Sequence, residues 1–134
     1  MAVLRSDSLP LQSSEDIVRV RQTVRQWAVQ AGFGLVDQTK IVTAASELAR
    51  NTVEYGRGGT MLMEALNDNN RRGLRLTFAD QGPGIADIEL ALKDGYTTGS
   101  GMGLGLGGAK RLVNEFTIAS RRDEGTRVTI TRWK

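Results

Sequence analysis

The 134-residue sequence contains no cysteine and no histidine. The absence of cysteine excludes disulfides and thiolate metal sites, and it favours a cytoplasmic location because disulfides persist in oxidising compartments. The absence of histidine excludes imidazole metal ligands, a histidine-containing catalytic triad and autophosphorylation on histidine. Any chemistry of this chain must therefore use other side chains or the backbone.

Long apolar runs are also absent: none approaches the roughly 20 residues of a membrane span, and the N-terminus lacks a signal-peptide core. We therefore expect no membrane partner. Aromatic residues make up only 5% of the chain, and no basic stripe is interleaved with them, so the net charge of +3 indicates a solvated basic surface rather than nucleic-acid binding. With 40% hydrophobic and 25% charged residues, the chain is predicted to form one globular domain over residues 1–134.

Hydrophobic spacing predicts an edge strand, two helices, a hairpin, a glycine-rich segment flanked by short helices, and a second hairpin. The expected helices cover 14–31, 37–55, 85–92 and 109–113, and the expected strands cover 1–8, 60–66, 74–80, 116–120 and 126–133. This grouping favours an α+β fold, a two-layer sandwich of helices on a mixed, mostly antiparallel sheet. A doubly wound parallel sheet would need regular strand–helix alternation.

Glu47 and Asn51 stand four residues apart on the second predicted helix. This spacing places both side chains on one side of the helix, at the border of its apolar face. There a carboxylate could handle a proton and a carboxamide oxygen could bind a hard metal ion. Taken alone, however, such a pair is more often an exposed helical surface.

The run Asp80-Gln81-Gly82-Pro83-Gly84 follows the second strand of the first predicted hairpin. Period-two alternation puts Asp80 on the same buried side as Leu76 and Phe78, so its carboxylate needs a hydrogen-bond donor. The same five residues would also suit an ordinary turn.

The segment from Lys93 to Gly108 holds seven glycines, which is typical of a mobile lid. Its run Gly101-Met102-Gly103-Leu104-Gly105-Leu106-Gly107-Gly108 could bring backbone N–H groups close to phosphate. The match to G-x-G-x-x-G does not indicate a Rossmann site, because no buried strand precedes it, and the spacing before Lys110 is not that of a Walker A motif. Together the three motifs predict a magnesium–nucleotide site.

The order and placement of these motifs resemble the GHKL (Bergerat-fold) superfamily of ATPases and kinases over nearly the whole chain. In that family residues 46–51 correspond to the N box, residues 80–85 to the G1 box, the glycine-rich segment to the G2 box, and residues 124–126 to the last glycine-threonine element. On so small a domain, these blocks are most similar to RsbT-like serine/threonine kinases of anti-sigma pathways, as is the run 35–38.

The resemblance implies a role for each matching residue. Asn51 would bind Mg²⁺, Glu47 would orient or deprotonate the acceptor hydroxyl, and Asp80 would accept a hydrogen bond from the adenine amino group. The implied nucleotide-binding residues are Asn51, Asp80, Gly82, Gly84, Ile85, Gly101, Met102, Gly103, Leu104, Gly105, Leu106 and Thr126.

The resemblance also implies a function. It indicates an ATP- and Mg²⁺-dependent protein serine/threonine kinase of a bacterial stress-response partner-switching (stressosome) system, which phosphorylates STAS-domain antagonist proteins and, once released, activates a PP2C-type phosphatase. The alternative is a nucleotide-gated anti-sigma factor that sequesters a sigma factor. A histidine-kinase catalytic domain is disfavoured by the missing histidine and the absence of dimerisation helices.

Two positions near the N box limit this comparison. Many superfamily members carry a basic or imidazole side chain where this chain has Glu54, so the cation near the transferred phosphate must come from elsewhere. Lys93, Lys110 and Arg111 are candidates. Arg50 lies about 100° round the helix from Asn51, which favours a surface or partner-facing role.

Overall fold

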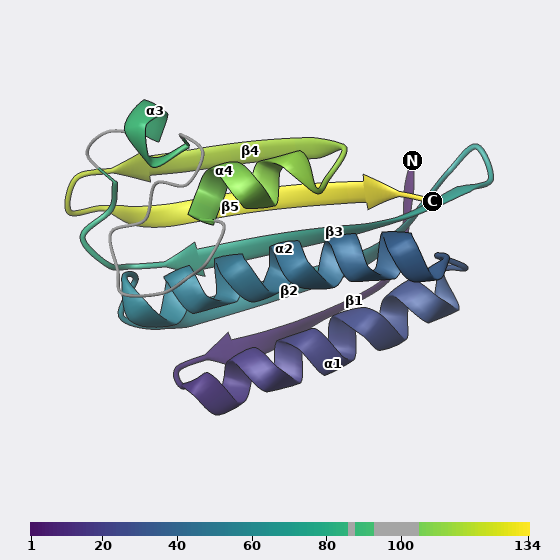
Figure 1. The fold of residues 1–134 in the computed structure, drawn as a ribbon, viewed down its shortest axis with the longest axis horizontal. Helices are drawn as coiled ribbons and strands as arrows, with labels where there is room; N and C mark the ends of the chain where they lie inside the picture. Colours follow the sequence, from purple (N-terminus) through teal and green to yellow (C-terminus); the bar gives the residue numbers. More distant parts are fainter. Residues whose placement is uncertain (86–87, 93–104) are drawn as a thin grey trace.

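The computed structural model describes residues 1–85, 88–92 and 105–134 (Figure 1). Its elements are β1 (Ala2–Leu11), α1 (Ser14–Gln30), α2 (Leu35–Glu54), β2 (Gly59–Asp68), β3 (Arg71–Asp80), α3 (Ile88–Ala91), α4 (Gly105–Arg111), β4 (Glu115–Arg121) and β5 (Gly125–Trp133).

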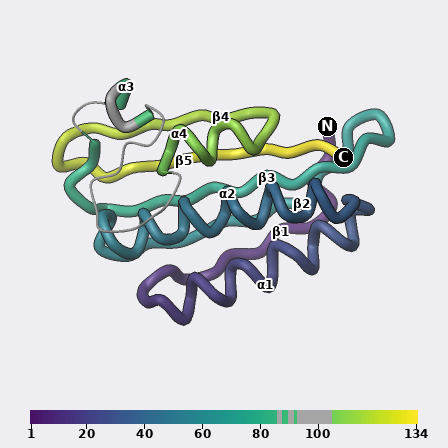
Figure 2. Tube along the Cα trace, in the orientation of Figure 1, coloured from purple at the N-terminus to yellow at the C-terminus, as the bar shows by residue number. Residues whose placement is uncertain are grey.

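Within the described residues, five strands form one sheet in the order β1-β2-β3-β5-β4. All four pairings between neighbouring strands are antiparallel. Helices α1, α2 and α4 lie over one face of this sheet, and Figure 2 traces the same two layers along the backbone. The predicted α+β sandwich is therefore confirmed.

The core lies between the two layers, as the two periodicities predict. Helices α1 and α2 bury apolar residues at helical spacing, and the sheet buries alternate residues of its central strands. The buried residues that form this core include Val20, Val24, Trp27, Ile41, Ala44, Ala45, Leu48, Met61, Met63, Leu74, Leu76, Phe78, Val128 and Ile130.

The loop between α1 and α2 differs from the prediction in where α2 begins. Gly32 has a φ of +84° and follows the end of α1, as expected for a left-handed glycine. Helix α2 starts at Leu35, two residues before the predicted start, Asp37. Leu35 and Val36 are exposed, so they add nothing to the apolar periodicity from which the helix was predicted.

The turn between β2 and β3 is shorter than the predicted seven-residue connection over 67–73. Asn69 and Asn70 have φ angles of +51° and +67°, so they form a tight two-residue turn. Asparagine tolerates the left-handed region, and such turns match the twist of a hairpin. The strands consequently continue to Asp68 and restart at Arg71.

The glycine-rich segment was predicted to remain a lid as far as Gly108, and this is wrong for its last four residues. Helix α4 begins at Gly105 and contains both Gly107 and Gly108. Leu106 and Ala109 are 7% and 0% exposed within the main core, and their burial outweighs the low helix propensity of glycine.

The opposite face of the sheet carries a cross-strand ion pair. Arg75 donates two hydrogen bonds to the Glu64 carboxylate, at 2.8 and 3.0 Å. These bonds hold the pKa of Glu64 below its ordinary value.

No helix in the described part of the chain is both long and apolar enough to cross a membrane.

Candidate functional site

The carboxyl end of α2 meets the end of β3 through closely packed glycines. A Cβ atom on Gly56 would lie 2.4 Å from Cγ of Asp80, and one on Gly82 would lie 2.7 Å from Cα of Gly56. Gly56 also donates its backbone N–H to the carbonyl of Asn51 at 3.0 Å. This packing joins the helix that carries Glu47 and Asn51 to the loop that follows Asp80.

The half-buried Asp80 carboxylate has the donors that its position requires. Its Oδ1 atom accepts hydrogen bonds from the backbone N–H groups of Gly82, at 2.9 Å, and Thr126, at 3.2 Å. Asp80 and Thr126 are paired across β3 and β5, so the sheet register fixes the second contact. Both hydrogen bonds from described residues use Oδ1. The other oxygen, Oδ2, could therefore accept a hydrogen bond from a ligand.

A hydroxyl network connects the loop after β3 with the β4–β5 hairpin. The Oγ atom of Ser120 lies 2.7 Å from Oγ1 of Thr126 and accepts the backbone N–H of Ile85 at 2.8 Å. Ile85 and Thr126, both predicted from the sequence, thus come together through a residue that sequence reasoning missed. The signal available for Ser120 was its position directly opposite Thr126 in the hairpin.

Two glycines in this region have backbone conformations that other residues rarely adopt. Gly84 has a φ of +75°, and a Cβ atom there would lie 1.9 Å from the Arg121 carbonyl oxygen. Gly125 has a φ of +85°, with the Asp80 carbonyl oxygen at 2.2 Å from its ideal Cβ position. Glycine is therefore required at both positions, and the loop after β3 packs directly on the β4–β5 turn.

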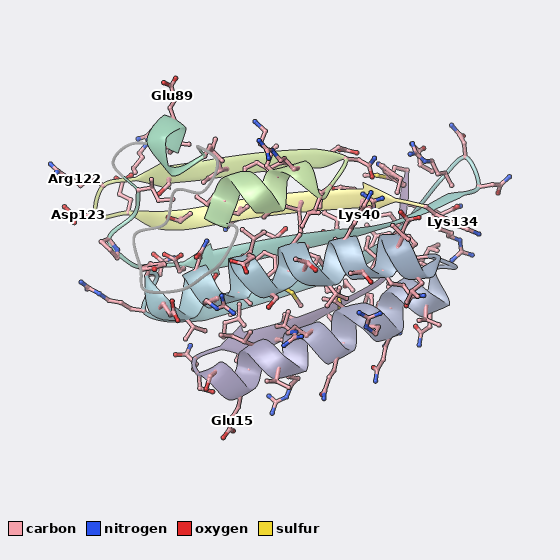
Figure 3. All side chains as sticks on the ribbon, in the orientation of Figure 1. Glu15, Lys40, Glu89, Arg122, Asp123 and Lys134 are labelled. Carbon is pink, nitrogen blue, oxygen red and sulfur yellow. The ribbon has the colours of Figure 1, made fainter. Side chains whose placement is uncertain are left out.

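That turn marks one end of the molecule. Figure 3 shows Arg122 and Asp123 at its tip, with their side chains directed outward, at the same end as the carboxyl terminus of α2. The backbone N–H of Asp123 donates to the Pro83 carbonyl at 2.6 Å. Lys40 and Lys134 lie toward the opposite end.

Glu47 has a close cationic neighbour. Its side chain is only 13% exposed, and its Oε1 lies 3.6 Å from Nη1 of Arg50. Arg50, interpreted from the sequence as a surface residue, therefore contacts the proposed catalytic carboxylate. The i,i+3 spacing of opposite charges was the signal for this pair.

Asn51 is half-buried on the last turns of α2. In the described ranges, no group of three or more acidic, histidine or cysteine side chains could hold a metal ion. A magnesium ion at Asn51 would thus take its other ligands from phosphate oxygens and water, which is the coordination that Mg²⁺ prefers. The residues present fit a metal that arrives with a nucleotide.

Several predicted contacts with phosphate cannot be placed. Gly101, Met102, Gly103, Leu104 and Lys93 lie outside the described residues. Gly105, with a φ of +69°, is the first residue of α4, and Leu106 is part of the main core. Lys110 and Arg111 are exposed in the last turn of α4.

Comparisons with known proteins give related sequences. Residues 12–132 match the family described as histidine kinase-like ATPase domain. The chain is 46% identical over 118 residues to the serine/threonine-protein kinase RsbT of Bacillus subtilis (strain 168), covering 88% of this chain and 89% of that protein. It is 26% identical over 129 residues to the anti-sigma F factor of Thermoanaerobacter sp. (strain X514), covering 92% and 89%.

Solved structures share the fold. The RsbU and RsbW domains of Rv1364c from Mycobacterium tuberculosis superpose with a TM-score of 0.66 at 23% identity, covering 97% of this chain and 33% of that one. The chain thus spans about a third of that structure. The SiaB–SiaC complex from Pseudomonas aeruginosa gives a TM-score of 0.57 at 12% identity, covering 98% of this chain and 91% of that one.

Proposed function

The chain belongs to the histidine kinase-like ATPase family as a serine/threonine kinase of the RsbT type, and we propose that it transfers the terminal phosphate of ATP to a STAS-domain regulatory protein. The observation that carries the ATP site is the environment of Asp80. Among the described residues, two backbone donors occupy its Oδ1 and none binds Oδ2, which would accept the adenine amino group.

The remaining roles follow from the position of the adenine. With the base at Asp80, Asn51 on α2 would be the residue that holds the magnesium ion of the nucleotide, because its carboxamide oxygen is a hard ligand. When bound, the metal would neutralise charge on the phosphate oxygens. Phosphoryl transfer depends mainly on such positioning and electrostatic stabilisation.

Glu47 is proposed to act on the acceptor. The serine or threonine oxygen attacks the terminal phosphorus, the bond between that phosphorus and the bridging oxygen of ADP breaks, and the hydroxyl proton passes to the Glu47 carboxylate. The adjacent Arg50 guanidinium holds this carboxylate in place, because the two groups are 3.6 Å apart in a partly buried setting. Arg50 is thus a positioning residue.

The test is transfer of labelled phosphate from ATP to purified STAS domains. Magnesium-dependent labelling of one serine or threonine is expected. Glu47→Gln should retain ATP binding and lower the transfer rate about a hundredfold or more, in the range of general base catalysis. Glu15→Gln, an exposed change in the first turn of α1, is the matched control. Equal losses of binding and transfer in Glu47→Gln would contradict the catalytic assignment.

We further propose that the protein works in the cytoplasm, in a stress-response partner switch of the stressosome type, and that the form released from the STAS protein activates a PP2C-type phosphatase. The 26% identity to an anti-sigma F factor over 92% of the chain favours a second candidate, sequestration of a sigma factor. Sigma-factor binding that depends on nucleotide, without transfer to any STAS domain, would support this alternative.

A further inference from the structure

Residues 17–36, which cover most of α1 and the start of α2, carry charge of only one sign. They include three arginines and no acidic residue. Arg19 is paired with Asp16 at 3.3 Å. Arg21 and Arg25 make no ion pair with any residue in the described ranges. The outward side of α1 is therefore basic, and its charge is only partly neutralised within the molecule.

Two further cations lie where α1 ends. The Arg5 guanidinium of β1 lies 4.1 Å from the centre of the Trp27 ring and donates to Oε1 of Gln30 at 2.9 Å. A Cβ atom on Gly32 would lie 3.0 Å from Nζ of Lys134, so that ammonium group reaches the turn between α1 and α2. Figure 3 shows Lys134 at this end of the molecule. Positive charge thus gathers around the turn.

Three exposed aliphatic side chains lie beside the same turn. Val29 is 56% exposed in the last turn of α1, and Leu35 and Val36 are 73% and 67% exposed in the first turn of α2. The two helices run antiparallel and are joined by residues 31–34, so all three side chains lie at one end of the molecule (Figure 1). An apolar patch with a polar rim is typical of an interaction site. We call Val29, Leu35, Val36, Arg5, Arg25 and Lys134 together the turn surface.

The nearest carboxylate in the sequence does not offset the charge of the turn surface. Asp37 is ion-paired with Arg132. Arg25 instead donates to Oε1 of Gln38 at 3.2 Å, and Gln38 donates to the Phe33 carbonyl at 2.8 Å. A neutral amide therefore positions the Arg25 guanidinium without neutralising it. The turn surface combines an apolar centre with net positive charge.

The turn surface continues along α1 as an open hollow. Its lining residues are Gln22, Arg25, Gln26, Val29 and Gln30. They recur at spacings of three and four residues, so they form one stripe along the helix. A stripe of this kind, with an aliphatic residue among long polar side chains, fits an elongated segment better than a compact ligand.

Charge and composition decide between the possible occupants. A second copy of this chain, in a two-fold interface, would place the turn surface against itself, so that cations would meet cations. A membrane interface favours exposed aromatic side chains, but the aromatic residues at this end, Trp27 and Phe33, are both buried. An acidic protein segment satisfies both the cations and the aliphatic patch.

We propose that the turn surface binds an acidic amphipathic helix of a partner protein. Aliphatic residues of that helix pack on Val29, Leu35 and Val36, and its carboxylates pair with Arg25 and Lys134. Such a helix would present its anchors at the same spacings of three and four residues as the stripe on α1.

This contact is separate from the candidate nucleotide site. Leu35 and Asn51 are about 24 Å apart along α2, at 1.5 Å per residue. The segment bound at the turn surface is consequently not the one that receives phosphate, and it leaves the carboxyl end of α2 accessible. The inference uses no nucleotide, so it goes beyond the proposed function and does not depend on it.

The test is a display library of random peptides of about 16 residues, between four and five helical turns. The library is selected on the intact wild-type protein and depleted on the double variant Leu35→Ser and Val36→Ser. Enriched peptides should carry aliphatic residues at helical spacing and an excess of Asp and Glu. Urea unfolding of the double variant checks that it remains folded.

Fluorescence anisotropy with a labelled synthetic copy of the most enriched peptide then measures affinity. The double variant should bind at least about tenfold more weakly, because two apolar anchors are lost. Arg25→Glu should weaken binding about fivefold by reversing one charge. Leu62→Ser, which removes an exposed leucine from β2, and Arg122→Glu, which reverses an exposed charge in the β4–β5 turn, are the matched controls and should bind as the wild type does.

Four results would overturn the inference. The first is no enrichment, or enrichment of basic peptides, and the second is equal peptide affinity in the double variant. The third is sedimentation with vesicles of phosphatidylcholine and phosphatidylserine that the double variant loses, which would identify a membrane-binding surface. The fourth is self-association that the double variant loses, which would identify an interface between copies.

The proposed function is tested separately by ADP titration of the same proteins. A wild-type protein that binds the peptide but not ADP would overturn the proposed function alone. One that binds ADP but selects no peptide would overturn this inference alone.

Discussion

The two ends of helix α2 are built in different ways. At the carboxyl end, Gly56 lies so close to Asp80 that a Cβ atom would collide with its carboxyl carbon at 2.4 Å. At the amino end, a Cβ atom on Gly34 would meet nothing within 4 Å, and Leu35 and Val36 are 73% and 67% exposed. The crowded end is the candidate nucleotide site, where the protein backbone must come close to the ligand.

The two ends of α2 therefore have different roles. At the carboxyl end, closely packed backbone holds the polar groups in place, so substitutions there are poorly tolerated. At the amino end, side chains make the contacts: Arg132 donates to Asp37 and to the Leu112 carbonyl, and Gln38 donates to the Phe33 carbonyl. Substitutions at the first end should affect nucleotide binding, and substitutions at the second should affect at most stability.

The largest effect is expected from Asn51→Ala. The change removes the only proposed protein ligand of magnesium, while alanine suits the helix. Affinity for ADP in magnesium should fall about a hundredfold, close to 2.8 kcal/mol, with the unfolding temperature little changed. Titration calorimetry with and without magnesium measures this, and equal ADP affinity in both proteins would contradict the assignment of Asn51.

Gly56→Ala should have the next largest effect. The added methyl group must displace the Asp80 carboxylate, and overpacking of this kind costs about 1–3 kcal/mol. Gly34→Ala is the control at the open end and should cost less than about 1 kcal/mol, since it alters only the N-cap. Urea unfolding of both variants tests the comparison directly, because similar losses would show that the two ends do not differ in packing.

A smaller and purely structural effect is expected from Arg132→Met. This side chain is 14% exposed and ion-paired with Asp37, which is 36% exposed. Its replacement should destabilise the fold by about 1 kcal/mol, because Asp37 loses its partner but stays partly hydrated. ADP affinity should not change. Arg121→Met is the control, because Arg121 is 83% exposed and its pair with Glu124 spans 3.9 Å. Weakened ADP binding in Arg132→Met would show that the two ends are coupled.

The smallest effect is expected from the double change Leu35→Ser and Val36→Ser. Both side chains are exposed, so stability should stay within about 0.5 kcal/mol of the wild type, and nucleotide binding should be unaffected. Chemical denaturation and ADP titration provide the two readouts. A large loss of stability would mean that these residues pack more tightly than their exposure indicates.

The sequence predicted the layers of the fold because both periodicities are regular in the core. Leu76 and Phe78 are alternate residues of β3, and both are buried on the side that the helices cover. The same alternation correctly put Asp80 where its carboxylate needs hydrogen-bond donors. That Asp80 and Thr126 lie in one site was predicted only from the family resemblance. Their contact depends on the pairing of β3 with β5, which are distant in sequence.

Other features were missed for physical reasons. Gly56 lies just beyond the helix predicted over 37–55, and nothing local to it indicates that Asp80 is within van der Waals distance. A single serine on a strand gives no signal of its own, so Ser120 emerged only from the hairpin register. The start of α4 at Gly105 was missed because tertiary packing of Leu106 overrides the local preference of glycine.

Hydrogen exchange of the intact protein, with and without Mg-ADP, tests the central claim most directly. We expect increased protection at the backbone N–H groups of Gly82, Ile85 and Thr126, and no change over residues 29–38, which cover the end of α1 and the start of α2. Unchanged exchange at those three groups, or protection centred on residues 29–38, would contradict the assignment of the nucleotide site to the carboxyl end of α2.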